Sequence, residues 1–153
     1  RVVEWIRESI DSSQFRFEPI GFGSRDAEME FAFPLDEKSV SGTLMAEGTS
    51  GSRKTKVAVE RVRTVMKRLL HEKIDLLKLD IEGAEYSVLS DMLDMGILLT
   101  QILVEFHHGK RKKGRVPVSE TKNLVERLKG FGYSNFWASQ SGRELALVRR
   151  RAV

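Results

Sequence analysis

The sequence contains no cysteine among its 153 residues. This absence excludes disulfide bonds, thiol nucleophiles and zinc sites built on cysteine, although it does not identify a cellular compartment. The sequence also lacks an apolar run that could span a bilayer, because the longest candidate, residues 95–106, is interrupted by Thr100 and Gln101. We therefore expect no membrane span, and we expect the protein in the cytoplasm.

The composition is that of a folded globular protein, with 41% hydrophobic and 31% charged residues. The length suits a single domain over residues 1–153. The net charge of +4 comes largely from two basic runs, "KRKKGR" at 110–115 and the terminal "VRRRAV". Neither run forms a continuous basic surface with interleaved aromatics, so we do not expect nucleic acid as a partner. We predict that residues 110–115 are exposed and that serines there leave stability nearly unchanged.

The first third of the chain has only weak secondary-structure signals. Residues 2–10 have the apolar spacing of a helix. Residues 15–23 and 27–33 are predicted strands, and the short segment "SRD" between them makes a hairpin plausible. The polar stretch from Pro34 to Lys56 predicts a long loop, and loops of that length in compact domains are usually functional or mobile.

Strands and helices alternate after residue 55, which predicts an α/β fold. Residues 73–81 are almost continuously apolar, as in strands that helices bury on both faces. The helix before them is expected to bury Leu69 and Leu70, and the helix after them to close at Gly96. The predicted strands are 56–62, 73–81 and 101–108, the predicted helices 62–70, 84–96 and 119–132, and the closing hairpin 133–139 with 144–150.

Three carboxylates stand at one predicted strand-to-helix corner, in "LLKLDIEGAEYSVL". Alternation places Asp80 and Glu82 on one side of the strand, at the carboxyl end where open α/β sheets bind ligands. Glu85 is fully explained as an acidic residue stabilised by the dipole at a helix N-terminus. Asp80 is not, because an unpaired charge inside an apolar strand is costly unless Lys78 pairs with it.

A second polar cluster, "VEFHH", ends the next predicted strand. If the two strands are neighbours, His107 converges with Asp80 and Glu82. A histidine beside carboxylates can act as a general base or bind a metal, and it can also be a hydrogen-bonded loop residue. Two carboxylates and a histidine could hold a divalent cation, but the sequence has no tight metal motif such as H-E-x-x-H, so we expect no resident metal.

Taken together, these segments resemble a known family. "KVAVERVRTVMKRLLHEKIDLLKLDIEGAEYSVL" is similar to the core of the FkbM-type S-adenosylmethionine-dependent methyltransferases, and "QILVEFHH" is similar to the strand that follows. "FRFEPIGFGSRDAEMEFAF" resembles the segment that precedes this core, and "SVSGTL" lies where related sequences carry a serine-bearing loop.

The resemblance implies a Rossmann-like methyltransferase fold, with a mostly parallel sheet and a C-terminal antiparallel hairpin. It implies S-adenosylmethionine as cofactor and a small-molecule or sugar hydroxyl as methyl acceptor. The family's glycine-rich loop and second-strand acidic residue are not found in this sequence. We therefore interpret residues 1–153 as the C-terminal portion of a class I methyltransferase domain, without its first β-α-β unit. On this interpretation Gly21, Phe22 and Ser41 contribute to the cofactor site.

For the reaction we predict His107 or Asp80 as the base and Glu82 as the group that orients the acceptor. The alternative is a non-catalytic or degenerate domain that acts structurally or binds an anionic ligand through its basic run. We expect a full-length parent protein to bind S-adenosylmethionine, and this chain to bind it weakly or not at all.

Overall fold

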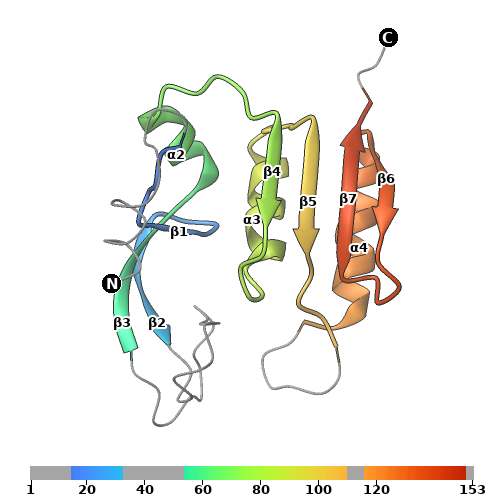
Figure 1. Cartoon of the computed structure of the whole chain (residues 1–153), viewed down its shortest axis with the longest axis horizontal. Helices are drawn as coiled ribbons and strands as arrows, with labels where there is room; N and C mark the ends of the chain where they lie inside the picture. The colour runs from blue at the N-terminus through green and yellow to red at the C-terminus, as the bar shows by residue number, and fades with distance from the viewer. Residues whose placement is uncertain (1–14, 33–53, 110–115, 151–153) are drawn as a thin grey trace.

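The computed structural model describes residues 15–32, 54–109 and 116–150 of the chain (Figure 1). These residues form two β-sheets, with strand orders β1-β3-β2 and β4-β5-β7-β6, together with three helices. The α/β class predicted from the sequence is confirmed. The predicted helix over residues 2–10, the loop with Ser41 and the basic run 110–115 lie outside the described residues. No helix in the described ranges has the length and apolar character that a membrane crossing requires.

The three-stranded sheet is built around its last strand in sequence. Its strands are β1 (Gly21–Phe22), β2 (Ala27–Ala32) and β3 (Lys54–Glu60). Strand β3 lies in the middle, parallel to β1 and antiparallel to β2, so the predicted hairpin between residues 15–23 and 27–33 is wrong. Strand β3 has a hydrogen-bonding edge on each side, and β1 and β2 each pair with one of these edges. Lys54 begins β3 and does not belong to the predicted loop.

The four-stranded sheet carries the helices. Its elements are β4 (Leu76–Leu79), β5 (Gln101–Glu105), β6 (Tyr133–Ala138), β7 (Glu144–Arg149), α3 (Glu85–Asp94) and α4 (Val118–Gly130), and α2 (Val62–Arg68) precedes them. Strands β4 and β5 are parallel, whereas β7 is antiparallel to both β5 and β6. The predicted closing hairpin is confirmed. The expectation of one mostly parallel sheet is wrong for the described residues, because β7 inserts between β5 and β6 and makes the sheet mixed.

Helices α3 and α4 lie against one face of this sheet (Figure 1). In β4 the side chains of Leu77 and Leu79 are buried, whereas Leu76 is half exposed and Lys78 is exposed. The prediction that residues 73–81 are buried on both faces is therefore wrong, because the described helices cover only one. The core is formed by alternate strand residues packed against helix residues such as Leu89.

The helix ends follow local backbone chemistry. After α3, Gly96 adopts a left-handed φ of 67° and the amide of Ile97 donates to the carbonyl oxygen of Met92 at 2.8 Å, as the sequence predicted. Helix α2 ends at Arg68, and Leu70 takes a similar φ of 57°. This turn directs Leu70 outward, where it is 88% exposed, so its predicted burial on the helix face is wrong.

Candidate active site

The turn between β4 and α3 presents two carboxylates to solvent. Asp80 directly follows β4 and its side chain is 45% exposed, which removes the desolvation cost expected for a charge inside an apolar strand. Glu82 has a left-handed φ of 53°, and Gly83 follows with a φ of 108°. Glycine adopts such values without steric cost, whereas glutamate seldom does. The chain thus reverses within a few residues and leaves Asp80 and Glu82 beside each other at the sheet edge.

A third carboxylate, Glu85, is fully buried beneath this turn. Its Oε1 atom accepts a hydrogen bond from the amide of Ile81 at 2.9 Å, and its Oε2 atom accepts one from the amide of Gly83 at 3.0 Å. A carboxylate that accepts from two backbone amides of one turn fixes the backbone around it. Glu85, in the first turn of α3, therefore does more than complement the helix dipole. The dipole was the explanation drawn from the sequence.

The same carboxylate holds His107, two residues beyond the end of β5. The His107 Nδ1 atom lies 2.8 Å from Glu85 Oε1. Where Glu85 accepts from His107, as it does from the two amides, the Nδ1–H group is the donor. The Nε2 atom then faces outward, 3.4 Å from Glu82 Oε2 and 3.8 Å from Asp80 Oδ1. The ring is mostly buried, with 15% of the side chain exposed.

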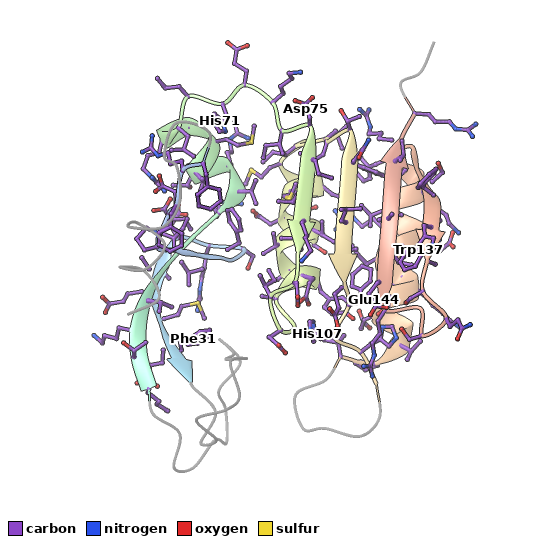
Figure 2. The ribbon with its side chains drawn as sticks, in the orientation of Figure 1. Phe31, His71, Asp75, His107, Trp137 and Glu144 are labelled. Atoms are coloured by element: carbon purple, nitrogen blue, oxygen red, sulfur yellow. The ribbon has the colours of Figure 1, made fainter. Side chains whose placement is uncertain are left out.

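The predicted convergence of the two clusters is confirmed. Leu79 of β4 pairs with Val104 of β5 in parallel register, so the carboxyl ends of both strands meet at one edge of the sheet. Figure 2 shows His107 at this edge, below the ends of β4 and β5. Asp80, Glu82 and His107 each offer one ligand atom, and these three atoms all lie within 4.8 Å of one another.

A mainly apolar cavity of about 210 Å³ adjoins the corner on the sheet face away from α3 and α4. Asp80 lines it at the site end, and the half-exposed Trp137 forms part of its wall. Glu105 and Glu144 also line it, from neighbouring positions in β5 and β7. The cavity gives the corner an adjacent surface on which a small molecule could lie.

His108 faces away from this edge. It is 7% exposed, and its Nδ1 atom lies 2.9 Å from the Thr121 hydroxyl of α4, which in turn lies 2.8 Å from the Tyr86 hydroxyl. Burial raises the pKa of Tyr86, and the hydrogen bond to Thr121 opposes that shift. The Thr121–Tyr86 pair joins α4 to α3, and we interpret His108 as a packing residue on α4, in contrast to its neighbour.

Two of the three predicted cofactor residues belong to the three-stranded sheet. Gly21 and Phe22 form β1 in the three-stranded sheet, and Phe22 packs against the hydrophobic core. Ser41 is outside the described residues. Their assignment to a cofactor site stays a prediction. Glu85 is the residue whose role the sequence did not predict, because the helix dipole explained it, and its available signal was the close spacing of a third carboxylate to Asp80 and Glu82.

Comparison with known proteins identifies the class. Residues 20–134 match the family described as the methyltransferase FkbM domain. This match covers well over half of the chain, so the chain belongs to the FkbM methyltransferase family. The resemblance seen in the sequence is confirmed. Neither the curated proteins nor the solved structures contain a match.

Proposed function

We propose that this protein transfers a methyl group from S-adenosylmethionine to a hydroxyl group of a small molecule or sugar. Membership of the FkbM family supports methyl transfer. The observation that carries the acceptor chemistry is the His107 ring, which the buried Glu85 orients so that Nε2 faces Asp80 and Glu82. A hydroxyl nucleophile needs a group that takes its proton, and an oriented imidazole suits that task near neutral pH.

In the proposed reaction, the Nε2 atom of His107 takes the acceptor's proton. Glu85 keeps the proton of the neutral ring on Nδ1 and stabilises the imidazolium that forms, because its carboxylate stays within hydrogen-bond distance. Glu82 orients the acceptor by accepting a hydrogen bond. Asp80, which is closer to the apolar cavity, is the alternative base.

The chemistry of the corner fits the proposed cofactor. Exposed carboxylates favour a nearby positive charge and can accept hydrogen bonds from ribose hydroxyls, and Asp80 lies at a strand end where α/β sheets bind such ligands. When bound, S-adenosylmethionine supplies the methyl group from its sulfonium, and the acceptor oxygen gains it as the carbon–sulfur bond breaks. Gly21, Phe22 and Ser41 are proposed to complete the cofactor site. Since this cofactor is a cytoplasmic metabolite, we propose that the protein acts there.

A transfer assay tests the proposal. The full-length protein that carries this sequence would be incubated with methyl-labelled S-adenosylmethionine and a panel of sugars and small hydroxyl compounds, with product detected by mass spectrometry. We expect His107→Ala to lower the rate about 10²- to 10⁴-fold, the range for loss of a general base. The matched control is His71→Ala, which removes an exposed histidine at the opposite end of the sheet (Figure 2).

Two results would contradict the proposal. Equal rates for His107→Ala and the wild type would exclude His107 as the base and leave Asp80 to be tested by Asp80→Asn. No binding of S-adenosylmethionine by the full-length protein, measured by calorimetry, would instead favour the non-catalytic domain considered from the sequence.

A further inference from the structure

We propose, in contrast to the expectation drawn from the sequence, that Asp80, Glu82 and His107 form a binding site for a divalent transition-metal cation of the Mn²⁺ or Zn²⁺ type. The three residues bring one imidazole nitrogen and two carboxylate oxygens together within 4.8 Å, from the ends of two adjacent strands. Among the residues that the structure describes, this is the group of histidine and acidic side chains with that geometry.

The histidine is held as metal ligands usually are. A metal-bound imidazole almost always donates its other ring N–H to a carboxylate or carbonyl group, which fixes the tautomer and the ring orientation. Glu85 is such a carboxylate, because it is buried, lies 2.8 Å from Nδ1 and is itself fixed by two backbone amides. The Nε2 lone pair of the neutral ring therefore points toward Asp80 and Glu82.

The two separations that involve His107 are close to those between ligand atoms around a bound cation. Ligand atoms about 2.1 Å from a metal lie about 3.0–3.4 Å from one another in octahedral or tetrahedral geometry. The Nε2 atom is 3.4 Å from Glu82 Oε2, within that range, and 3.8 Å from Asp80 Oδ1. Asp80 is 45% exposed, so its side chain can rotate to make up the difference.

The ligand set indicates which cations fit. Imidazole suits zinc and other late transition metals, whereas carboxylates also suit manganese and magnesium. One nitrogen with two oxygens therefore favours Mn²⁺ or Zn²⁺ over Ca²⁺ or Mg²⁺, which prefer oxygen ligands alone. Three protein ligands leave at least one position open for a water or an acceptor oxygen.

Cation binding would change how the site activates an acceptor, a consequence that depends on the proposed function. Nε2 cannot bind a cation and accept a proton at the same time. In the cation-bound form the metal would instead lower the pKa of a coordinated hydroxyl group, whose proton passes to water. Cation binding itself requires neither S-adenosylmethionine nor an acceptor, and can be measured without them.

The test is calorimetric titration of the whole chain with MnCl₂, ZnCl₂ and MgCl₂ in separate experiments. We expect saturable binding of one Mn²⁺ or Zn²⁺ per chain and much weaker binding of Mg²⁺. Asp80→Asn and His107→Ala should each weaken binding at least tenfold, and Glu85→Gln about 10- to 100-fold, as expected for a residue that orients a ligand. The matched controls are His71→Ala and Asp75→Asn, whose exposed side chains lie at the other end of the sheet (Figure 2) and should not alter binding.

The proposal fails if the folded wild-type chain shows no saturable binding, or if the site variants and the controls bind alike. Circular dichroism verifies the fold of each variant. If His107→Ala does not fold, Glu82→Gln replaces it, because the Glu82 side chain is 36% exposed. A chelator separates the two proposals: methyl transfer that persists in chelator but is lost in His107→Ala would support the base and exclude a required cation.

Discussion

The two sheets of the molecule are stabilised in different ways. In the four-stranded sheet, alternate residues of β4, β5 and β7 enter a continuous core with α3 and α4, and β6 contributes Tyr133 at its start. The three-stranded sheet contributes Val59 as its buried hydrophobic residue among those described, and its strands β2 and β3 are bridged by the ion pairs Lys54–Glu30 and Lys56–Glu28. Exposed ion pairs add little stability, whereas apolar burial adds much.

This difference in packing between the two sheets helps to explain where the candidate site lies. Asp80 and His107 follow the hydrogen-bonded strands β4 and β5 of the sheet with the large core, and Glu85 begins the helix α3 that packs on that sheet. A site that requires fixed distances is better held by packed elements than by a weakly packed sheet. We therefore expect substitutions in the four-stranded sheet to affect stability and the site together, and those in the three-stranded sheet to affect neither strongly.

The largest effect is expected for Phe106→Ala. Phe106 is fully buried directly before His107 and its ring lies 5.2 Å from that of Tyr86, measured between centroids. Its removal leaves a cavity that should lower the free energy of unfolding by about 3–5 kcal/mol, measured by urea denaturation. The control is Phe136→Ala, where the ring is 80% exposed and the change should stay within about 0.5 kcal/mol. Similar losses in both variants would refute the proposed importance of the core.

A smaller effect is expected for Glu85→Ala. The substitution leaves the amides of Ile81 and Gly83 without their carboxylate, which should lower the free energy of unfolding by about 1–3 kcal/mol. The matched control is Glu120→Ala, an exposed acidic residue in the first turn of α4. Glu120→Ala should lose only the helix-dipole contribution of about 0.3–1 kcal/mol. If both variants lost equally little, the dipole explanation drawn from the sequence would suffice for Glu85.

The sequence predicted the four-stranded sheet better than the three-stranded one. Strands β4 and β5, helix α3 and the closing hairpin were found because each has a strong apolar period and clear end signals such as Gly96. Pairing within the first sheet was missed, because β1 has only two residues and its partner β3 lies more than thirty residues further along the chain. Pairing between distant short strands depends on tertiary context that local patterns do not contain.

The sequence predicted which residues converge at the candidate site, but not what holds His107 in place. Strand alternation and parallel neighbours were enough to bring Asp80 and His107 together. The role of Glu85 could not be found in this way, because the helix dipole already explained an acidic residue at its position. Its contact with Nδ1 depends on the reversal at Glu82 and Gly83, and left-handed backbone at a glutamate is not predictable from its residue type.

A still smaller, regional effect is expected for Asp91→Ala. Asp91 of α3 accepts hydrogen bonds from Arg61, which directly follows β3, so this pair links the two sheets. Its loss should speed amide hydrogen exchange in β3 while leaving exchange in β5 and β7 unchanged. The matched control is Asp94→Ala, which removes an exposed partner of Arg127 within the α3 and α4 layer. Faster exchange in all strands would show that the two sheets open as one unit.

The smallest effect is expected for Lys54→Ser, which removes the exposed ion pair with Glu30. The hydrogen bond from Lys54 is the main cause that lowers the pKa of Glu30, and Lys56 contributes least. A depressed carboxyl pKa adds stability above its unfolded-state value, and that stability is lost as pH falls through the folded-state pKa. We therefore expect Lys54→Ser to raise the Glu30 pKa in an NMR titration, Lys56→Ser to raise it less, and neither to change the urea midpoint at pH 7 measurably. A clear shift of that midpoint would mean that ion pairs hold the three-stranded sheet more strongly than their exposure implies.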